Sequence, residues 1–247
     1  MPRADRLSLN ADGLHLPAVD HLSNNGSLNV VLDRTIGGGP TGFPQSRSAL
    51  GLLSNFVRLV DKSLREYDAA RAELMSYVEP HKGSLRTSPY IRAVDHMENC
   101  VGATHRSVLN ARALRELGVG GGAPKLTARQ EARLAHVRNA VEHSDEKLLG
   151  KQKFNNSPPF CSGEPYSLRL ANTAMVIGGL VLSYKDLFSA MTKMYQTVEK
   201  VRRVPTGTPG PHFPNAMLRT TVPPRAVQGN IRASDYLKEL SRLSVNH

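Results

Sequence analysis

The sequence has no tryptophan, few other aromatic residues and only two cysteines. With aromatic residues at 5% of 247, the chain has little with which to stack the bases of a single-stranded nucleic acid. Cys100 and Cys161 are too few for a disulfide framework or a cysteine zinc cluster, so we expect two reduced thiols, with Cys100 buried in a helix. Any nucleic acid that this protein binds should therefore contact Arg and Lys through its phosphates.

Long hydrophobic runs and cofactor motifs are also missing. The longest strongly apolar run, residues 174–182, is too short to span a bilayer, and the first residues lack the apolar stretch of a secretory signal. No Gly-rich run is followed by GK[ST], and no HExxH or G-x-S-x-G is present. His136 and His143 would lie about 10.5 Å apart along a helix, too far for one metal ion. We therefore expect a soluble, cytoplasmic protein that needs no cofactor, no metal and no membrane.

Positive charge is what the chain has in excess. Its formal net charge is +11 and its isoelectric point is about 9.9. Such a surface attracts polyanions, of which RNA and DNA come first. A generic basic surface, or basic tails that bind nothing specific, would give the same net charge. Net charge affects association with other molecules and does not indicate the fold.

The pattern of residue types divides the chain into three parts. Residues 1–45 are rich in Asn, Gly, Pro and Asp without a sustained period, and we expect a flexible, extended arm. Residues 46–204 have apolar residues at helical spacing and are predicted to form one helical body. Residues 205–247 form a Pro-rich linker that ends in a short amphipathic helix at 234–244, which should dock on the body or on a partner.

Four helices are predicted within the body, over residues 46–79, 88–117, 127–150 and about 167–204. Gly or Pro follows the first three, and Thr127 with Gln130 has the form of a capping box before the third. Gly178 and Gly179 are expected to let a neighbouring helix approach the fourth. This pattern predicts an all-α, antiparallel four-helix bundle. The residues expected on the apolar faces include Leu53, Val57, Val60, Leu64, Tyr67 and Leu74 in the first helix, Ile91, Met97, Val101, Val108 and Leu114 in the second, and Ile177, Val181, Tyr184, Phe188, Met191 and Val198 in the fourth.

The candidate site lies in the third helix, in the stretch LAHVRNAVEH at 134–143. Arg-x4-His spacing alone says little, since about one match is expected by chance and Arg242 with His247 gives another. Its context is more specific, because it lies mid-helix after two apolar residues and has a polar Asn139 beside the arginine. In this it resembles the HEPN family (higher eukaryotes and prokaryotes nucleotide-binding), all-α domains with an Arg-polar-x3-His signature. The resemblance covers residues 46–204.

The resemblance implies a function and a set of partners. Active members of the family are metal-independent endoribonucleases, usually homodimers with a composite site. It therefore implies RNA as the substrate, a role as a toxin or defence component, and a cognate antitoxin or other protein as partner. The catalytic residues carried over to this chain are Arg138, Asn139 and His143.

These residue types suit RNA cleavage. A neutral His143 can take the proton of the 2′-hydroxyl as that oxygen attacks phosphorus, and its protonated form can protonate the leaving 5′-oxygen. Arg138 can stabilise the added negative charge in the transition state, and Asn139 can orient the histidine or the phosphate. The product would carry a 2′,3′-cyclic phosphate, and DNA, which lacks the 2′-hydroxyl, should not be cleaved.

Helix geometry leaves an alternative open. Arg138 and His143 would lie about 140° apart around a regular helix, so they converge only through a bent side chain, a local helix irregularity or a second subunit. The alternative is a helix surface on which Arg138 pairs with Glu142 and His143 is solvated. In that reading the protein is a non-catalytic helical interaction or scaffold module with a basic surface.

Overall fold

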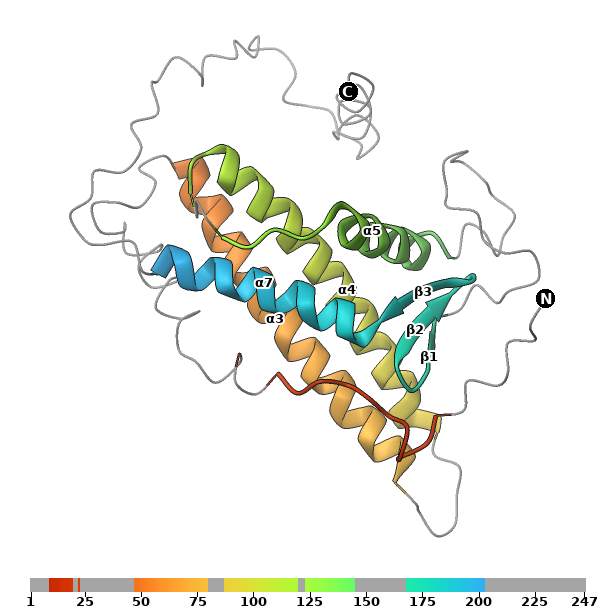
Figure 1. Ribbon diagram of the computed structural model, residues 1–247. Coiled ribbons are helices and arrows are strands. Elements are labelled where there is room, and N and C mark those ends of the chain that lie inside the picture. Colours follow the sequence, from red (N-terminus) through yellow and green to blue (C-terminus); the bar gives the residue numbers. More distant parts are fainter. Residues whose placement is uncertain are drawn as a thin grey trace, which may run out of the picture. The chain divides into compact units, whose positions relative to one another are not determined.

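A computed structural model describes residues 9–19, 22, 47–79, 87–119, 123–144 and 168–202 (Figure 1). This part of the chain is mostly helical and includes one small antiparallel sheet. Cys161 and the expected tail helix at 234–244 lie outside the described residues. The elements are α3 (Arg47–Val78), α4 (Thr87–Glu116), α5 (Ala128–Glu142), β1 (Arg169–Leu170), β2 (Ala174–Ile177), β3 (Leu180–Ser183) and α7 (Tyr184–Arg202).

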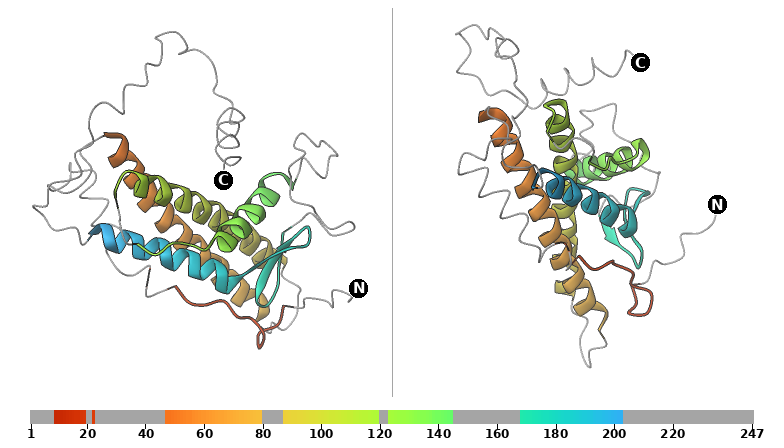
Figure 2. Two further views of the ribbon diagram at one scale, coloured as in Figure 1. Left: turned by 45° about the horizontal axis from the view of Figure 1, so that its top comes forward. Right: turned by 60° about the vertical axis from the view of Figure 1, so that its left-hand side comes forward.

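The two longest helices, α3 and α4, lie side by side and antiparallel (Figures 1 and 2). The apolar face predicted for the first helix is confirmed, since Leu53, Val57, Tyr67 and Leu74 are fully buried. Polar side chains connect the two helices along one flank. Because the helices are antiparallel, residue numbers in these contacts rise on α3 as they fall on α4. These contacts join Lys62 to Asn99 (3.5 Å), Glu66 to His96 (2.8 Å) and Glu73 to Arg92 (2.7 Å).

One residue of α4 that was predicted to face the core does not. Ile91 of α4 is 57% exposed, whereas Met97 is fully buried. The two residues lie about 120° apart around the helix, because a repeated step of three residues drifts away from the true helical period. Along the rest of α4 the buried positions follow steps of three and four, as an apolar face requires.

The ends of α4 and α5 form as their sequences predict. Gly118 has a φ of 72°, its N–H donates to the Arg115 carbonyl oxygen (2.9 Å), and the Val119 N–H donates to the Leu114 carbonyl oxygen (2.8 Å). That is a Schellman motif, which needs a left-handed residue and therefore favours glycine. Before α5, the Thr127 hydroxyl accepts from the Gln130 N–H (3.2 Å) and the Gln130 side chain accepts from the Thr127 N–H (3.1 Å), so the capping box is confirmed.

The prediction of the fourth helix is wrong over the first half of its range. Residues 169–183 form a three-stranded antiparallel sheet in the order β1-β2-β3, and α7 begins only at Tyr184. Gly178 and Gly179 have φ values of 54° and 80° and make the turn in which Ile177 pairs with Leu180. A two-residue turn with positive φ at both positions matches the twist of a β-hairpin. The glycines therefore serve a tight turn rather than a close helix contact.

The sheet changes the fold class that the sequence predicts. Ile177 is buried in β2, while Val181 in β3 is 51% exposed, so the two do not share the helical face expected of them. The second half of the prediction holds, since Tyr184, Met191 and Val198 of α7 are buried. The protein is not all-α, and a four-helix bundle is not confirmed.

Part of the expected N-terminal arm packs against the helical body. Residues 9–19, which include a turn at 11–13, lie beside the β1–β2 turn, where the His15 N–H donates to the Asn172 carbonyl oxygen (2.8 Å) and the Asn10 N–H donates to the Asn172 side chain (3.1 Å). Val19 is fully buried. Apart from residue 22, the rest of the predicted arm lies outside the described residues.

The β2–β3 turn provides a test of this assignment. Gly179→Val should lower the free energy of unfolding by about 1–2 kcal/mol, because a β-branched residue resists positive φ. Gly179→Asn should cost clearly less, since asparagine adopts the left-handed region more readily. Urea unfolding measures both, and equal stabilities of the two variants would contradict the turn.

Candidate functional site

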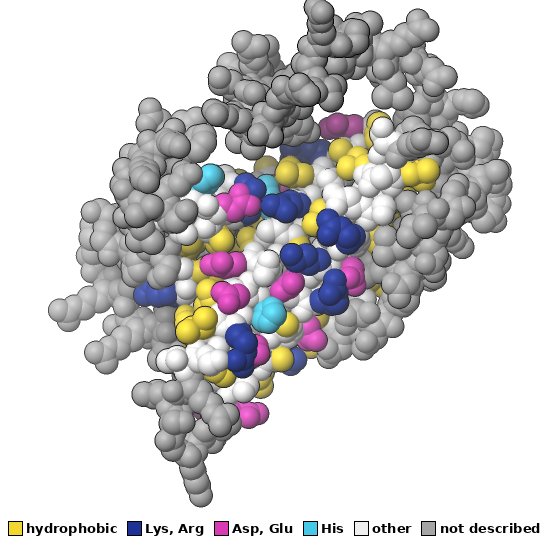
Figure 3. Space-filling model, turned by 180° about the vertical axis from the view of Figure 1, so that it is seen from behind, with side chains coloured by type: hydrophobic (Ala, Val, Ile, Leu, Met, Phe, Trp, Pro, Cys, Tyr) yellow, Lys and Arg dark blue, Asp and Glu magenta, His cyan; other side chains and the backbone are white. Residues whose placement is uncertain are grey.

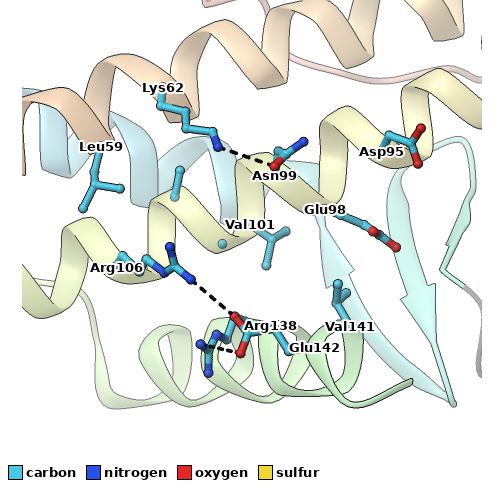
Figure 4. Close-up of a pocket in the computed structure, with 12 residues that line it drawn as sticks. Leu59, Lys62, Asp95, Glu98, Asn99, Val101, Arg106, Arg138, Val141 and Glu142 are labelled. Atoms are coloured by element: carbon cyan, nitrogen blue, oxygen red, sulfur yellow. Dashed lines mark hydrogen bonds and ion pairs between the residues drawn. The ribbon is translucent and has the colours of Figure 1, made fainter. Parts of the chain in front are cut away.

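A hollow lined by Arg138, one of the predicted catalytic residues, lies between α3, α4 and α5 and has a volume of about 420 Å³ (Figure 4). We call it the α3–α4–α5 groove. Its α4 residues follow one helical stripe, because Asp95, Glu98, Gly102 and Arg106 are separated by steps of three and four. The complete lining is Leu59 and Lys62 from α3, Asp95, Glu98, Asn99, Val101, Gly102, Ala103 and Arg106 from α4, and Arg138, Val141 and Glu142 from α5.

One end of the groove is built around two arginines that share a carboxylate. Arg138 forms an ion pair with Glu142, one turn later on α5, and its Nη1 donates to the Asn139 side chain (3.0 Å). The other oxygen of Glu142 lies 3.8 Å from Nη2 of Arg106. The Nε of Arg138 is buried and has no hydrogen-bond partner among the described residues. The Arg138–Glu142 pair of the alternative interpretation is therefore present, with a second arginine beside it.

His143 lies where α5 ends. It is the C-cap residue, with φ −114° and ψ 16°, and its N–H donates to the Asn139 carbonyl oxygen (3.1 Å). The helix α5 thus ends at Glu142, so the 140° separation of a regular helix does not apply, and residues 145–150 of the predicted third helix lie outside the described residues. His143 is half-buried, and neither it nor Asn139 lines the groove. Of the three predicted site residues, only Arg138 reaches this hollow.

The surroundings of the arginines are electropositive. Burial, together with the positive charges of Arg138, Arg106 and Arg112, lowers the pKa of His105 to about 4. His105 is therefore neutral near pH 7, and its Nδ1 has no hydrogen-bond partner among the described residues. An anion placed at this end of the groove would meet favourable potential from several side chains.

The other end of the groove is acidic. Burial raises the pKa of Glu98, and the neighbouring charge of Asp95 raises it further. Neither carboxylate has a hydrogen bond or ion pair with another residue of the described ranges. Figure 4 shows both on the α4 stripe, away from Arg138 and Glu142. The groove therefore has two ends of opposite charge.

Three of these polar residues were not singled out by sequence reasoning: Lys62, Asp95 and Arg106. The sequence shows only that the polar residues of α4 recur at helical spacing. A polar stripe that faces solvent and one that lines a groove have the same spacing, so the sequence cannot distinguish them. The position of α5 decides between the two. Ion pairs hold α5 there, through Arg112 to Glu131 and through Arg133 to Asp186 (3.0 Å).

Other candidates in the described residues offer less. Cys100 is fully buried, as expected, and burial raises its pKa to about 12. No three His, Cys, Asp or Glu side chains of the described ranges gather closely enough to bind a metal ion. Within those ranges no helix is long and apolar enough to cross a membrane. On the face seen in Figure 3, Lys and Arg alternate with Asp and Glu and do not form one basic patch.

Comparison of the chain with protein-family models, with curated proteins and with solved structures finds no match.

Gly102 is the residue that keeps the centre of the groove open. A Cβ atom at Gly102, or at Gly51 in α3, would meet nothing within 4 Å, whereas one at Gly13 would lie 2.5 Å from the Asn172 side chain. Gly102→Ala and Gly51→Ala should each raise the free energy of unfolding by up to about 1 kcal/mol, because alanine is the better helix former. Gly13→Ala should lower it. Urea unfolding measures these changes. If Gly102→Ala were less stable than the unchanged protein, the added methyl group would clash with other atoms, and the space beside Gly102 would not be open.

Proposed function

We propose that the protein is an RNA-binding endoribonuclease of HEPN-like type that works without metal, with Arg138, Asn139 and His143 as its catalytic residues. The observation that supports this best is the placement of Arg138. It lines an open groove together with Arg106 and Lys62, in an electropositive setting, one turn before the helix ends at His143. The end of α5 at this point is a local irregularity of the helix, which is one of the ways in which Arg138 and His143 could converge.

RNA binding begins with an exchange of partners at Arg138. Its side chain is 25% exposed, so a phosphate oxygen can reach it and replace the Glu142 carboxylate. Arg106, also close to Glu142, then contributes a second guanidinium to the same phosphate. The buried Nε of Arg138 adds a donor that no described residue uses. Both arginines favour the dianionic transition state over the monoanionic phosphodiester.

His143 moves the protons in this proposal. Its neutral ring takes the proton of the 2′-hydroxyl, and its protonated ring delivers a proton to the leaving 5′-oxygen. Since His143 does not line the groove of its own subunit, we assign the reaction to a site shared by two copies, in which the pairs of both subunits face one RNA strand. Asn139, which accepts from Arg138, positions the guanidinium.

A second function is favoured by one specific observation. Arg138 already has Glu142 as an ion partner, and an arginine so paired is often structural. In that alternative the protein is a non-catalytic interaction module, and the groove binds a partner without cleaving it.

RNA cleavage in EDTA distinguishes the two functions. The protein should cleave single-stranded RNA to 2′,3′-cyclic phosphate ends and leave the matching DNA intact. His143→Ala should reduce the rate about 100-fold or more, as expected for loss of a general acid–base. His136→Ala is the matched control, because His136 is exposed on the same helix outside the α3–α4–α5 groove, and it should cleave at the normal rate.

Two outcomes contradict the nuclease. One is cleavage that disappears in EDTA, and the other is cleavage that is unchanged in His143→Ala. Absence of cleavage together with RNA binding that depends on Arg106 and Arg138 supports the interaction module.

A further inference from the structure

The two ends of the α3–α4–α5 groove select for two different chemical groups. Glu98 and Arg106 lie on one stripe of α4, about 12 Å apart along the helix axis. Figure 4 shows the carboxylates of Asp95 and Glu98 toward one end and the guanidiniums of Arg106 and Arg138 toward the other. A volume of about 420 Å³ lies within the range of about 300–1,000 Å³ that is usual for small-molecule sites. The groove therefore fits one elongated ligand with unlike ends.

The middle of the groove suits a flat or apolar part of such a ligand. Val101, Ala103 and Val141 contribute apolar surface there, and Gly102 adds no side chain. A Cβ atom at Gly102 would meet nothing within 4 Å, so ligand atoms can approach the helix backbone at this point.

The acidic end requires N–H donors from its ligand. Asp95 and Glu98 repel one another and have no hydrogen bond or ion pair with other described residues. Burial has already removed part of the water around Glu98, and this raises its pKa. A ligand that brings N–H groups to both carboxylates would relieve the repulsion and replace the lost hydration.

We propose that this groove binds a nucleotide with its phosphate at Arg106 and Arg138 and its base at Asp95 and Glu98, and that it prefers guanine. Carboxylates accept hydrogen bonds from base amino groups. Guanine has N–H donors on two adjacent atoms and can meet one carboxylate with two parallel hydrogen bonds. Adenine and cytosine each present a single amino group, and uracil has none, so it should bind weakest.

This inference rests on the proposed function in one respect, which is that RNA supplies the nucleotide. It does not depend on cleavage, because it concerns residues that take no part in proton transfer.

Calorimetric titration of the full-length protein with 5′-GMP, AMP, CMP and UMP at one salt concentration tests the inference. GMP should bind about tenfold tighter than UMP, as expected for one bidentate base contact. The double variant Asp95→Asn, Glu98→Gln should lose this preference and keep the affinity for UMP. Glu116→Gln, which removes a charge from the same helix outside the groove, should keep the preference.

Two more variants test the position of the ligand. Gly102→Leu should weaken binding of all four nucleotides about tenfold or more by filling the groove, whereas Gly51→Leu, on α3 outside the groove, should not. Thermal unfolding of each variant shows whether it is folded.

The inference is overturned if GMP does not bind, if the four nucleotides bind equally, or if the preference survives in the double variant. These results leave the RNA cleavage assay unaffected. Conversely, selective binding of GMP without cleavage of RNA would support the proposed base preference and contradict the proposed nuclease activity.

Discussion

The antiparallel contact between α3 and α4 is the constraint on which the rest of the structure depends. The apolar face of α3 is buried along most of its length, and α4 presents one apolar face to α3 and α7 and one polar stripe to the groove. Cys100 on the buried face lies 3.7 Å from the Met191 sulfur of α7. Because the buried face fixes the position of α4, its polar stripe can carry the carboxylates of Asp95 and Glu98, which have no ion partner among the described residues, together with Arg106.

The end of α5 turns this polar stripe into a candidate site. Arg138 and Glu142 come from its last turn and meet Arg106 of α4, so the local charge balance depends on one carboxylate between two guanidiniums. In the proposed function a bound phosphate would compete with Glu142 for the same two guanidiniums. In the proposed function, the chain's excess of positive charge favours encounter with RNA, and the groove selects the part of the RNA that is contacted.

Local signals in the sequence predicted much of the fold. The apolar stripe of α3, the Thr127–Gln130 capping box and the Gly118 helix stop each depend on near neighbours. The sheet was missed because residues 174–182 form a continuous apolar run, which suits a buried strand and a buried helix equally. Arg138, predicted from the sequence as a catalytic residue, lines the groove, whereas the sequence did not locate the helix end at His143, where no glycine marks the cap. Asp95 and Arg106 became candidates only through the position of α5, which is a tertiary contact.

Photo-cross-linking tests the central claim, that RNA contacts this groove, most directly. A short single-stranded RNA with 4-thiouridine and guanosine would be irradiated with the full-length protein, and the attached peptides identified by mass spectrometry. We predict cross-links to the α4 segment 98–106 and to the end of α5, suppressed in Gly102→Leu. Cross-links confined to other segments, or unchanged in that variant, would contradict the account.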